Sequence, residues 1–352
     1  MFSPLLSLLL VPFLVAMFLA MNMGASGTSP SFSAAYGANL LPREAIPGLF
    51  GTFVFLGAIL AGKKVTLTIG GGILPGEIMG LPLTTVILLA IALSLLMANL
   101  LRVPQSTSQS TVFALIGSAL YLNMLHTRKL FLEIIPTWFI LPIVSFLITL
   151  FIGEFLYNPL RRCGRMRFAD LGRRPLLRVI VIAVSCYVAF AIGSNNVANA
   201  AGPLTSMLMN DLNIQPGGEG STLVMLLAML VVAPHFGVGS SLLGHRVVHT
   251  TGKEIVEFGP LGATLIAVVT ASLLLLASVS RGIPTSLVQM NTAAIIGLGI
   301  SKLGWREIIT RSAVMRLLTI WILAPLVAMT LAFLFTMVVD RVGWIAWPTA
   351  AP

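Results

Sequence analysis

A pair of short polar segments occurs twice in this sequence, once in each half. Asn22–Ser29 ends an apolar run and is followed later by Pro104–Gln109; Gly193–Leu204 ends another apolar run and is followed by Pro284–Gln289. After each proline come Ser at the second, Gln at the fifth and Gly at the thirteenth position: Ser106, Gln109 and Gly117, then Ser286, Gln289 and Gly297. Polar breaks at matching places in two halves predict two related halves whose breaks meet at a binding site.

The remaining sequence is too apolar for a soluble globule. Of its 352 residues, 57% are hydrophobic and only 9% are charged, which is typical of a protein that spans a membrane. Runs near the length needed to cross a bilayer are Pro4–Met21, Ile46–Ala61, Leu81–Leu101, Val112–Leu125 and Ile134–Tyr157 in the first half, and Leu176–Gly193, Leu223–Leu243, Leu261–Ser280, Ser286–Ile300 and Leu317–Val339 in the second. We predict an all-α, polytopic helical membrane protein with two inverted repeats, broken helices and re-entrant hairpins.

The basic residues suggest how the chain is divided and oriented. An arginine-rich segment separates the fifth and sixth runs, with Arg161, Arg162, Arg165, Arg167, Arg173, Arg174 and Arg178. Because basic residues in short loops mark the cytoplasmic side, we predict a first membrane repeat over 1–157, a basic cytoplasmic loop over 158–177 and a second membrane repeat over 178–352. Both termini would then lie outside. The first half fits this orientation less well, because Lys63, Lys64, Arg128 and Lys129 would face outward.

The net charge of +10 does not indicate nucleic-acid binding. The arginine segment is explained by the headgroups of the lipid bilayer, so no nucleic-acid partner is expected. Cys163 and Cys186 are too few for a disulfide framework or a metal site. We therefore expect no cofactor and no metal.

The residues at the breaks carry hydrogen-bond donors and no charge. Pro104 and Pro284 each fit the first turn of a short helix, whose N-terminus would attract an anion. Non-helical backbone at membrane depth must line a cavity or be covered by protein. We predict an anion pocket near the midplane whose substrate-binding residues are Gly24, Ser26, Gly27, Ser106, Thr107, Ser108, Asn195, Asn196, Thr285 and Ser286.

A structural alternative exists for each break. A Gly-Ala-Ser stretch in a membrane helix is more often a close-packing face than a site, and for Asn22–Ser29 alone packing is favoured. The duplication favours a site.

At these residues the chain resembles the inorganic phosphate transporter family. The segments that carry the likeness are GASG and PQSTS in the first half, with GSNNVANAAGPL and PTSLVQ in the second. The family's signatures are G-A-N-D-V-A-N and P-x-S-T-T-H, and the closer likeness is to its sulfate permease branch. The resemblance implies a secondary transporter in a prokaryotic inner (plasma) membrane, with an oxyanion held between the broken helices and the hairpins.

The departures from the family pattern concern its ionisable residues. The Asp of the family motif is Gly27 in the first half and Asn196 in the second, while the hairpin His is Gln109 and Gln289. Hydrogen phosphate carries a proton that needs an acceptor, whereas sulfate is a dianion with acceptors only. A pocket of amides, hydroxyls and helix N-termini therefore favours sulfate over phosphate.

The same departures leave the coupling cation open. Without the family's Asp, a sodium site would need backbone carbonyls with Asn22, Gln109, Asn199 or Gln289, and proton coupling needs a titratable group. We expect import of sulfate by cation symport, with the proton favoured. The alternatives are a sodium-coupled inorganic phosphate symporter and a selective anion channel. An enzyme is not expected, because no nucleophile with a base and no metal cluster is seen; homo-oligomerisation is left open.

Overall fold

The computed structural model describes residues 4–101, 105–159, 175–244, 259–309 and 312–345, and all regular secondary structure in these ranges is helical. Pro104 and most of the arginine segment lie outside the described residues, as do 245–258. The prediction that 158–177 forms a cytoplasmic loop therefore stays a prediction.

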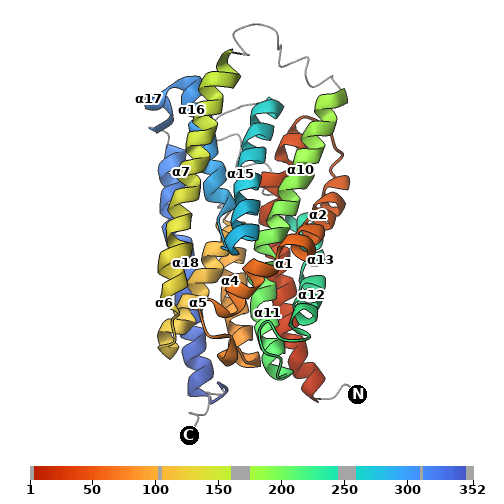
Figure 1. The fold of residues 1–352 in the computed structure, drawn as a ribbon, viewed down its shortest axis with the longest axis vertical. Helices are drawn as coiled ribbons and strands as arrows, with labels where there is room; N and C mark the ends of the chain where they lie inside the picture. The colour runs from red at the N-terminus through yellow and green to blue at the C-terminus, as the bar shows by residue number, and fades with distance from the viewer. Residues whose placement is uncertain (1–3, 102–104, 160–174, 245–258, 310–311, 346–352) are drawn as a thin grey trace.

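The first half contains a long first helix, a bent pair, a hairpin and a long returning helix (Figure 1). The elements are α1 (Pro4–Gly37), α2 (Ala45–Ala61), α3 (Lys63–Gly71), η1 (Gly76–Ile78), α4 (Leu81–Leu100), α5 (Thr107–Leu122), α6 (Thr127–Lys129), η2 (Leu130–Ile134), α7 (Ile135–Ile152) and η3 (Gly153–Tyr157).

The second half repeats the general order. Its elements are α10 (Pro175–Asn196), α11 (Ala198–Asp211), α12 (Ser221–Val232), α13 (Pro234–Gly239), η4 (Ser240–Gly244), α15 (Gly259–Arg281), α16 (Leu287–Leu303), α17 (Trp305–Ile309) and α18 (Ser312–Arg341).

The predicted apolar runs fall on helices, so the all-α membrane fold is confirmed. Val112–Leu125 extends past the end of α5 at Leu122, and Leu223–Leu243 is divided among α12, α13 and η4. Among the described residues, seven helices are long and apolar enough to cross a membrane, or up to eight if the bent pair of α2 and α3 is one span. The start of α1 and the end of α18 lie at the same end of the molecule, whereas the end of α7 and the start of α10 lie at the other (Figure 1). The two halves thus cross the molecule in opposite directions, as an inverted repeat requires.

The break predicted at Asn22–Ser29 is wrong, because α1 continues as one helix from Pro4 to Gly37. Its hydroxyls bond to carbonyls of the preceding turn: Thr28 Oγ1 donates to Gly24 O at 2.7 Å, and Ser31 Oγ to Gly27 O at 2.9 Å. Such back-bonding satisfies the polar side chains within the helix. The segment therefore does not have to leave helical geometry to satisfy them.

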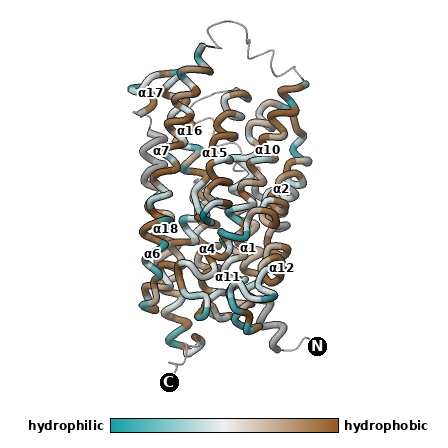
Figure 2. Tube along the Cα trace, in the orientation of Figure 1, coloured by the Kyte–Doolittle hydropathy of each residue, from teal (hydrophilic) through white to brown (hydrophobic). Residues whose placement is uncertain are grey.

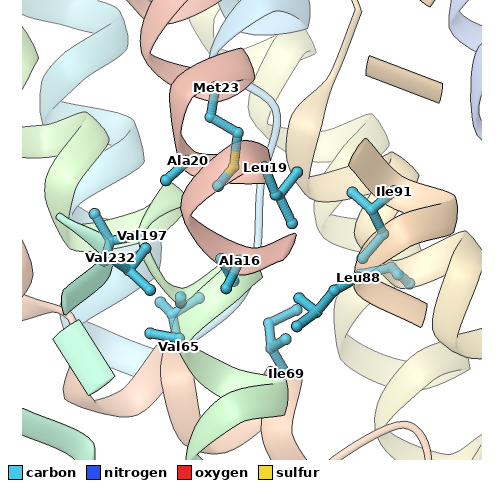
Figure 3. Close-up of a cluster of buried hydrophobic side chains, with 14 of the residues drawn as sticks. Ala16, Leu19, Ala20, Met23, Val65, Ile69, Leu88, Ile91, Val197 and Val232 are labelled. Carbon is cyan, nitrogen blue, oxygen red and sulfur yellow. The ribbon is translucent and has the colours of Figure 1, made fainter. Parts of the chain in front are cut away.

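The break in the second half is a single residue. Helix α10 ends at Asn196 and α11 begins at Ala198, with Val197 between them. Val197 is buried in the apolar core around α1, on the same side as Val232 and Val65 (Figure 3). A larger interruption lies at Gly62, directly after the predicted run Ile46–Ala61, where α2 and α3 are bent by 76°. The continuing helix α3 is not among the predicted runs.

Each half contains a helical hairpin, α4 with α5 in the first half and α15 with α16 in the second. The second helix of each hairpin packs on a long helix of the other half. Helix α5 lies against α18, where an added Cβ at Gly117 would collide with the carbonyl of Met329, and α16 lies against α7, where Gly297 faces the carbonyl of Phe146 in the same way. The two glycines thirteen residues after the prolines therefore allow equivalent close approaches. Hydrophilic segments lie near the middle of the bundle, between α15, α4 and α1 (Figure 2).

Candidate substrate site between two helical hairpins

Helices α5 and α16 begin with the same serine cap. Ser106 Oγ accepts from the backbone N–H of Gln109 at 3.3 Å, and Ser286 Oγ accepts from that of Gln289 at 3.2 Å. The prediction that proline opens each helix is wrong for Pro284, since α16 begins at Leu287. A serine oxygen can satisfy a free N–H of the first turn, which a proline ring cannot.

The two helix starts are joined by the glutamines of their first turns. Gln109 Nε2 donates to Gln289 Oε1 at 3.0 Å, and Gln289 Nε2 donates to Gln109 Oε1 at 3.0 Å. Both side chains are buried. Each amide keeps one N–H and one lone pair for another partner, so the pair can still serve a ligand.

Two helix N-termini therefore meet inside the protein. Each carries a partial positive charge, and the first N–H groups of a helix have no acceptor within it. The serine caps satisfy the N–H groups of Gln109 and Gln289. The first-turn N–H groups of Thr107 and Ser108 in α5, and of Leu287 and Val288 in α16, have no acceptor within their own helices. This arrangement favours an anion.

Asn195, near the end of α10, is fully occupied by the protein. Its Oδ1 accepts from Ser108 Oγ at 3.1 Å and from the backbone N–H of Thr285 at 3.2 Å. Its Nδ2 donates to Ser278 Oγ at 2.8 Å and to Ile283 O at 3.0 Å. Both hydrogens and both lone pairs of the amide are thus used, and Asn195 ties the two hairpins together.

Asn196 and Asn199 differ from Asn195 in their free capacity. Asn196 is only 8% exposed, and its side-chain amide has no hydrogen-bond partner among the described residues. Asn199 Nδ2 lies 3.5 Å from Thr107 Oγ1 and 3.4 Å from Ser108 Oγ, whereas its buried Oδ1 has no partner there. The buried hydroxyl of Thr285 also has none. Because unpaired buried polar groups are costly, these atoms are the ones that a ligand would satisfy.

The predicted residues of α1 are occupied by helix packing. An added Cβ at Gly24 would collide with the backbone of Phe236, and one at Gly27 would lie 3.0 Å from the Phe50 ring. Ser26 Oγ donates to Met23 O at 3.1 Å, within its own helix. The prediction that these residues lie at a break is wrong, because α1 is continuous through them. The Gly-Ala-Ser stretch of α1 is therefore a close-packing face, which is the alternative given for this segment.

Asn22 lies in α1 beside the first hairpin. Its Nδ2 donates to Phe18 O at 2.9 Å, and Asn99 Nδ2 of α4 donates to Asn22 O at 3.1 Å and to Asn22 Oδ1 at 3.3 Å. The contact thus fixes the end of α4 to α1.

Three residues that support the site, Gln105, Ser94 and Ser278, are not among the predicted site residues. Gln105 Nε2 donates to Ser94 Oγ at 3.0 Å and to Ser110 Oγ, while its buried Oε1 has no partner among the described residues. Gln105 lies within the repeated proline segment, so the sequence offered a signal for it. Ser94 and Ser278 belong to no repeated segment, so no sequence pattern identifies them.

The interior is polar but uncharged. Every buried polar side chain in the described ranges belongs to Ser, Thr, Asn or Gln. Among the same residues, His, Cys, Asp and Glu form no group that could hold a metal ion. The arrangement can bind an anion through neutral donors and cannot repel it with a buried carboxylate.

Comparison with known proteins then decides the class of this chain. The model of the phosphate transporter family matches residues 23–169 and 162–332. The chain belongs to this family. The family is one of transporters, and its members are not enzymes.

Some relatives in this family are named for sulfate and others for phosphate. The sulfate permease CysP of Bacillus subtilis is 32% identical over 326 residues, 92% of this chain and 86% of the relative. The chloroplastic inorganic phosphate transporter 2-1 of Arabidopsis thaliana is 30% identical over 161 residues, which cover 45% of this chain and 26% of that protein. The solved structure of a sodium-dependent phosphate transporter superposes with a TM-score of 0.80 at 21% identity and covers 96% of this chain and all of its own, which shows the shared fold. The chain is therefore a multi-pass membrane protein of an anion transporter family.

Proposed function

We propose that this protein imports sulfate by symport with a cation. The observation that carries the proposal is the uncharged site at the meeting of two helix N-termini, joined by Gln109 and Gln289. The similarity to a sulfate permease over 92% of the chain supports the same anion.

The residues proposed to contact sulfate are those with free hydrogen-bonding capacity at this site. Asn196, Thr107 and Thr285 bring amide and hydroxyl groups. Ser108 brings its first-turn backbone N–H, because its hydroxyl already donates to Asn195, while Ser106 and Ser286 cap the helix starts. Asn195 is proposed to hold the two hairpins in position. Gly24, Ser26 and Gly27 are proposed to support the site from α1.

Selectivity for sulfate is proposed to follow from the lack of carboxylates that could accept the proton of hydrogen phosphate. The family's Asp positions are Gly27 and Asn196 here, so neither can accept the proton of hydrogen phosphate with a carboxylate. A neutral donor set satisfies the oxygens of a dianion and leaves a phosphate hydroxyl without a strong acceptor.

The proton is proposed as the coupled cation. The described interior has no buried carboxylate that could serve as a sodium ligand. Because it also has no buried carboxylate to carry a proton, the protons are proposed to pass through water or a histidine near the interface. Inward movement of a dianion against the membrane potential costs about 2.3 kcal/mol per charge per 100 mV. At least two protons must therefore accompany each sulfate, and a third would add drive from the potential.

The alternative is a sodium-coupled phosphate symporter. It is supported by the name of the family and by the sodium-dependent phosphate transporter that shares the fold. The buried oxygen of Asn199, which has no partner in the described ranges, is the oxygen in this structure best suited to a sodium ion.

Uptake into proteoliposomes tests these proposals. Imposed pH, sodium and voltage gradients are compared in turn with labelled sulfate and labelled phosphate. We expect saturable sulfate uptake driven by an inward proton gradient, with weak competition by phosphate. Sodium-dependent uptake that prefers phosphate would establish the alternative, and non-saturable flux without counterflow would indicate a channel.

The division of the chain also remains a proposal. We propose two inverted membrane repeats over 1–157 and 178–352, joined by the basic cytoplasmic loop, in the inner membrane of a prokaryote. The opposite directions of the two halves support it.

A further inference from the structure

Two lysines lie at the bend between the apolar helices α2 and α3. Lys63 and Lys64 follow Gly62 directly, where α2 and α3 are bent by 76°, and both side chains are exposed. The pair is apolar and long enough to be one span. A charged side chain within a span is costly unless it faces water or protein, so two exposed lysines at this bend require surroundings of that kind.

Lys64 touches the second hairpin. Its Nζ donates to Ser280 O, in the last turn of α15, at 3.1 Å. Gly282, with φ of +65°, lies so close that an added Cβ would be 2.6 Å from Lys64 O. The ammonium group therefore lies beside the turn that leads to the start of α16.

A third lysine, Lys129 of α6, contacts the same face of α3 that carries Lys64. Lys129 Nζ donates to Thr68 Oγ1 at 2.7 Å, and Thr68 Oγ1 donates to Lys64 O at 3.1 Å. Lys63 Nζ donates to the hydroxyl of Thr222 at 3.1 Å. Within the described ranges these three ammonium groups have neutral hydrogen-bond partners. Glu133, one turn after Lys129, offsets part of the charge of that lysine without an ion pair at bonding distance, so the cluster keeps an excess of positive charge.

We propose that Lys64 and Lys129, with Lys63 beside them, form a vestibule that draws the oxyanion from water toward the second hairpin. The inner site has no charged side chain, and the partial positive charge of its two helix N-termini acts only over about the first turn. It therefore binds a dianion at close range and attracts it little from a distance. An excess of positive charge where the protein meets water raises the local concentration of an anion and its association rate. The vestibule rests on the proposed function, because it requires an anionic substrate.

Charge and hydrogen bonding at Lys64 can be separated by two variants. Lys64→Gln removes the charge and keeps a donor, whereas Lys64→Arg keeps the charge. At low ionic strength we expect Lys64→Gln to raise the KM for sulfate on the order of tenfold, with a maximal rate close to that of the wild-type protein. The dependence of KM on salt should flatten in the Gln variant and persist in the Arg variant. Arg43→Gln, in the turn between α1 and α2, is the control that should change neither.

A purely structural role for Lys64 would change the maximal rate or the stability instead of the salt dependence of KM. If the lysine only caps α15, Lys64→Gln lowers the maximal rate or the thermal stability and leaves the salt dependence of KM unchanged, which overturns the inference. Lys129→Gln is measured in parallel and should also raise KM at low salt, so a Lys64 variant that does not fold leaves the test intact.

Failure of the proposed function is distinguishable. Wild-type protein that transports neither sulfate nor phosphate refutes the function itself. Wild-type protein that transports either anion, combined with Lys64→Gln and Lys129→Gln variants that keep its KM and salt dependence, refutes only the vestibule.

Discussion

Gln109 and Gln289 hold each other through two reciprocal hydrogen bonds of 3.0 Å, although 180 residues separate them in the chain. Each belongs to the first turn of a hairpin helix, one from each half. The pair therefore connects the two hairpins at the point where their helix N-termini meet. Any movement that separates the hairpins must first break it.

Removal of one glutamine should cost more stability than removal of both. Gln109→Leu leaves the amide of Gln289 buried without its partner, which costs about 1–3 kcal/mol, whereas replacement of both partners by apolar groups can be nearly neutral. We expect Gln109→Leu and Gln289→Leu each to lower the thermal stability of the purified protein, and the double variant to recover part of the loss. Strictly additive losses would show that the amides are not coupled.

Asn195 and Asn196 form a matched pair for separating support from binding. Asn195→Ala removes four hydrogen bonds and should destabilise the protein by at least about 1–3 kcal/mol. Asn196→Ala removes no hydrogen bond to the described residues, so its stability should stay near that of wild type while sulfate uptake falls. Thermal unfolding and uptake are measured on both variants. Normal transport by a stable Asn196→Ala protein would remove Asn196 from the substrate site.

A carboxylate at the same position tests selectivity. Asn196→Asp should weaken sulfate binding, because a negative charge in a buried site repels a dianion. It should also supply an acceptor for a phosphate hydroxyl and an oxygen ligand for sodium. Competition uptake with each labelled anion against the other measures both effects. Unchanged sulfate affinity in the variant would show that Asn196 does not face the substrate.

The serine caps give a prediction about the helix starts. Ser106→Ala and Ser286→Ala each remove the acceptor for a first-turn N–H and should cost about 1 kcal/mol of stability, whereas replacement by Gly should cost only a few tenths. Thermal unfolding distinguishes the two substitutions at each position. Thr330→Val is the control, since Thr330 is exposed and bonds only within α18. Equal losses from Ala and Gly would argue against a capping role.

The direction of insertion can be tested by labelling. After Cys163 and Cys186 are changed to Ser, single cysteines at Met1, Arg167 and Pro352 are treated with a membrane-impermeant reagent. Inverted repeats with a cytoplasmic basic loop predict labelling from outside at the first and last positions and from inside at Arg167. Labelling of the two ends from opposite sides would exclude the inverted arrangement.

Sequence by itself determined where the helices are and which chemistry fills the interior. In a bilayer each backbone polar group must be satisfied internally, so an apolar run such as Leu81–Leu101 becomes a helix whatever packs against it. The duplicated proline segments located both hairpins, and the neutral residues at Asn196 and Gln289 indicated a site without carboxylates. These properties depend on local composition and spacing.

Tertiary structure decided which of these residues face one another. Asn195 and Asn196 are neighbours in the same motif, yet the first is consumed by both hairpins and the second is left without a partner among the described residues. Gly24 reads as part of a broken helix, but the approach of the Phe236 backbone makes it a packing position. Such outcomes depend on contacts between segments far apart in the chain, whose geometry is set by how the two halves pack and is not encoded in any local pattern.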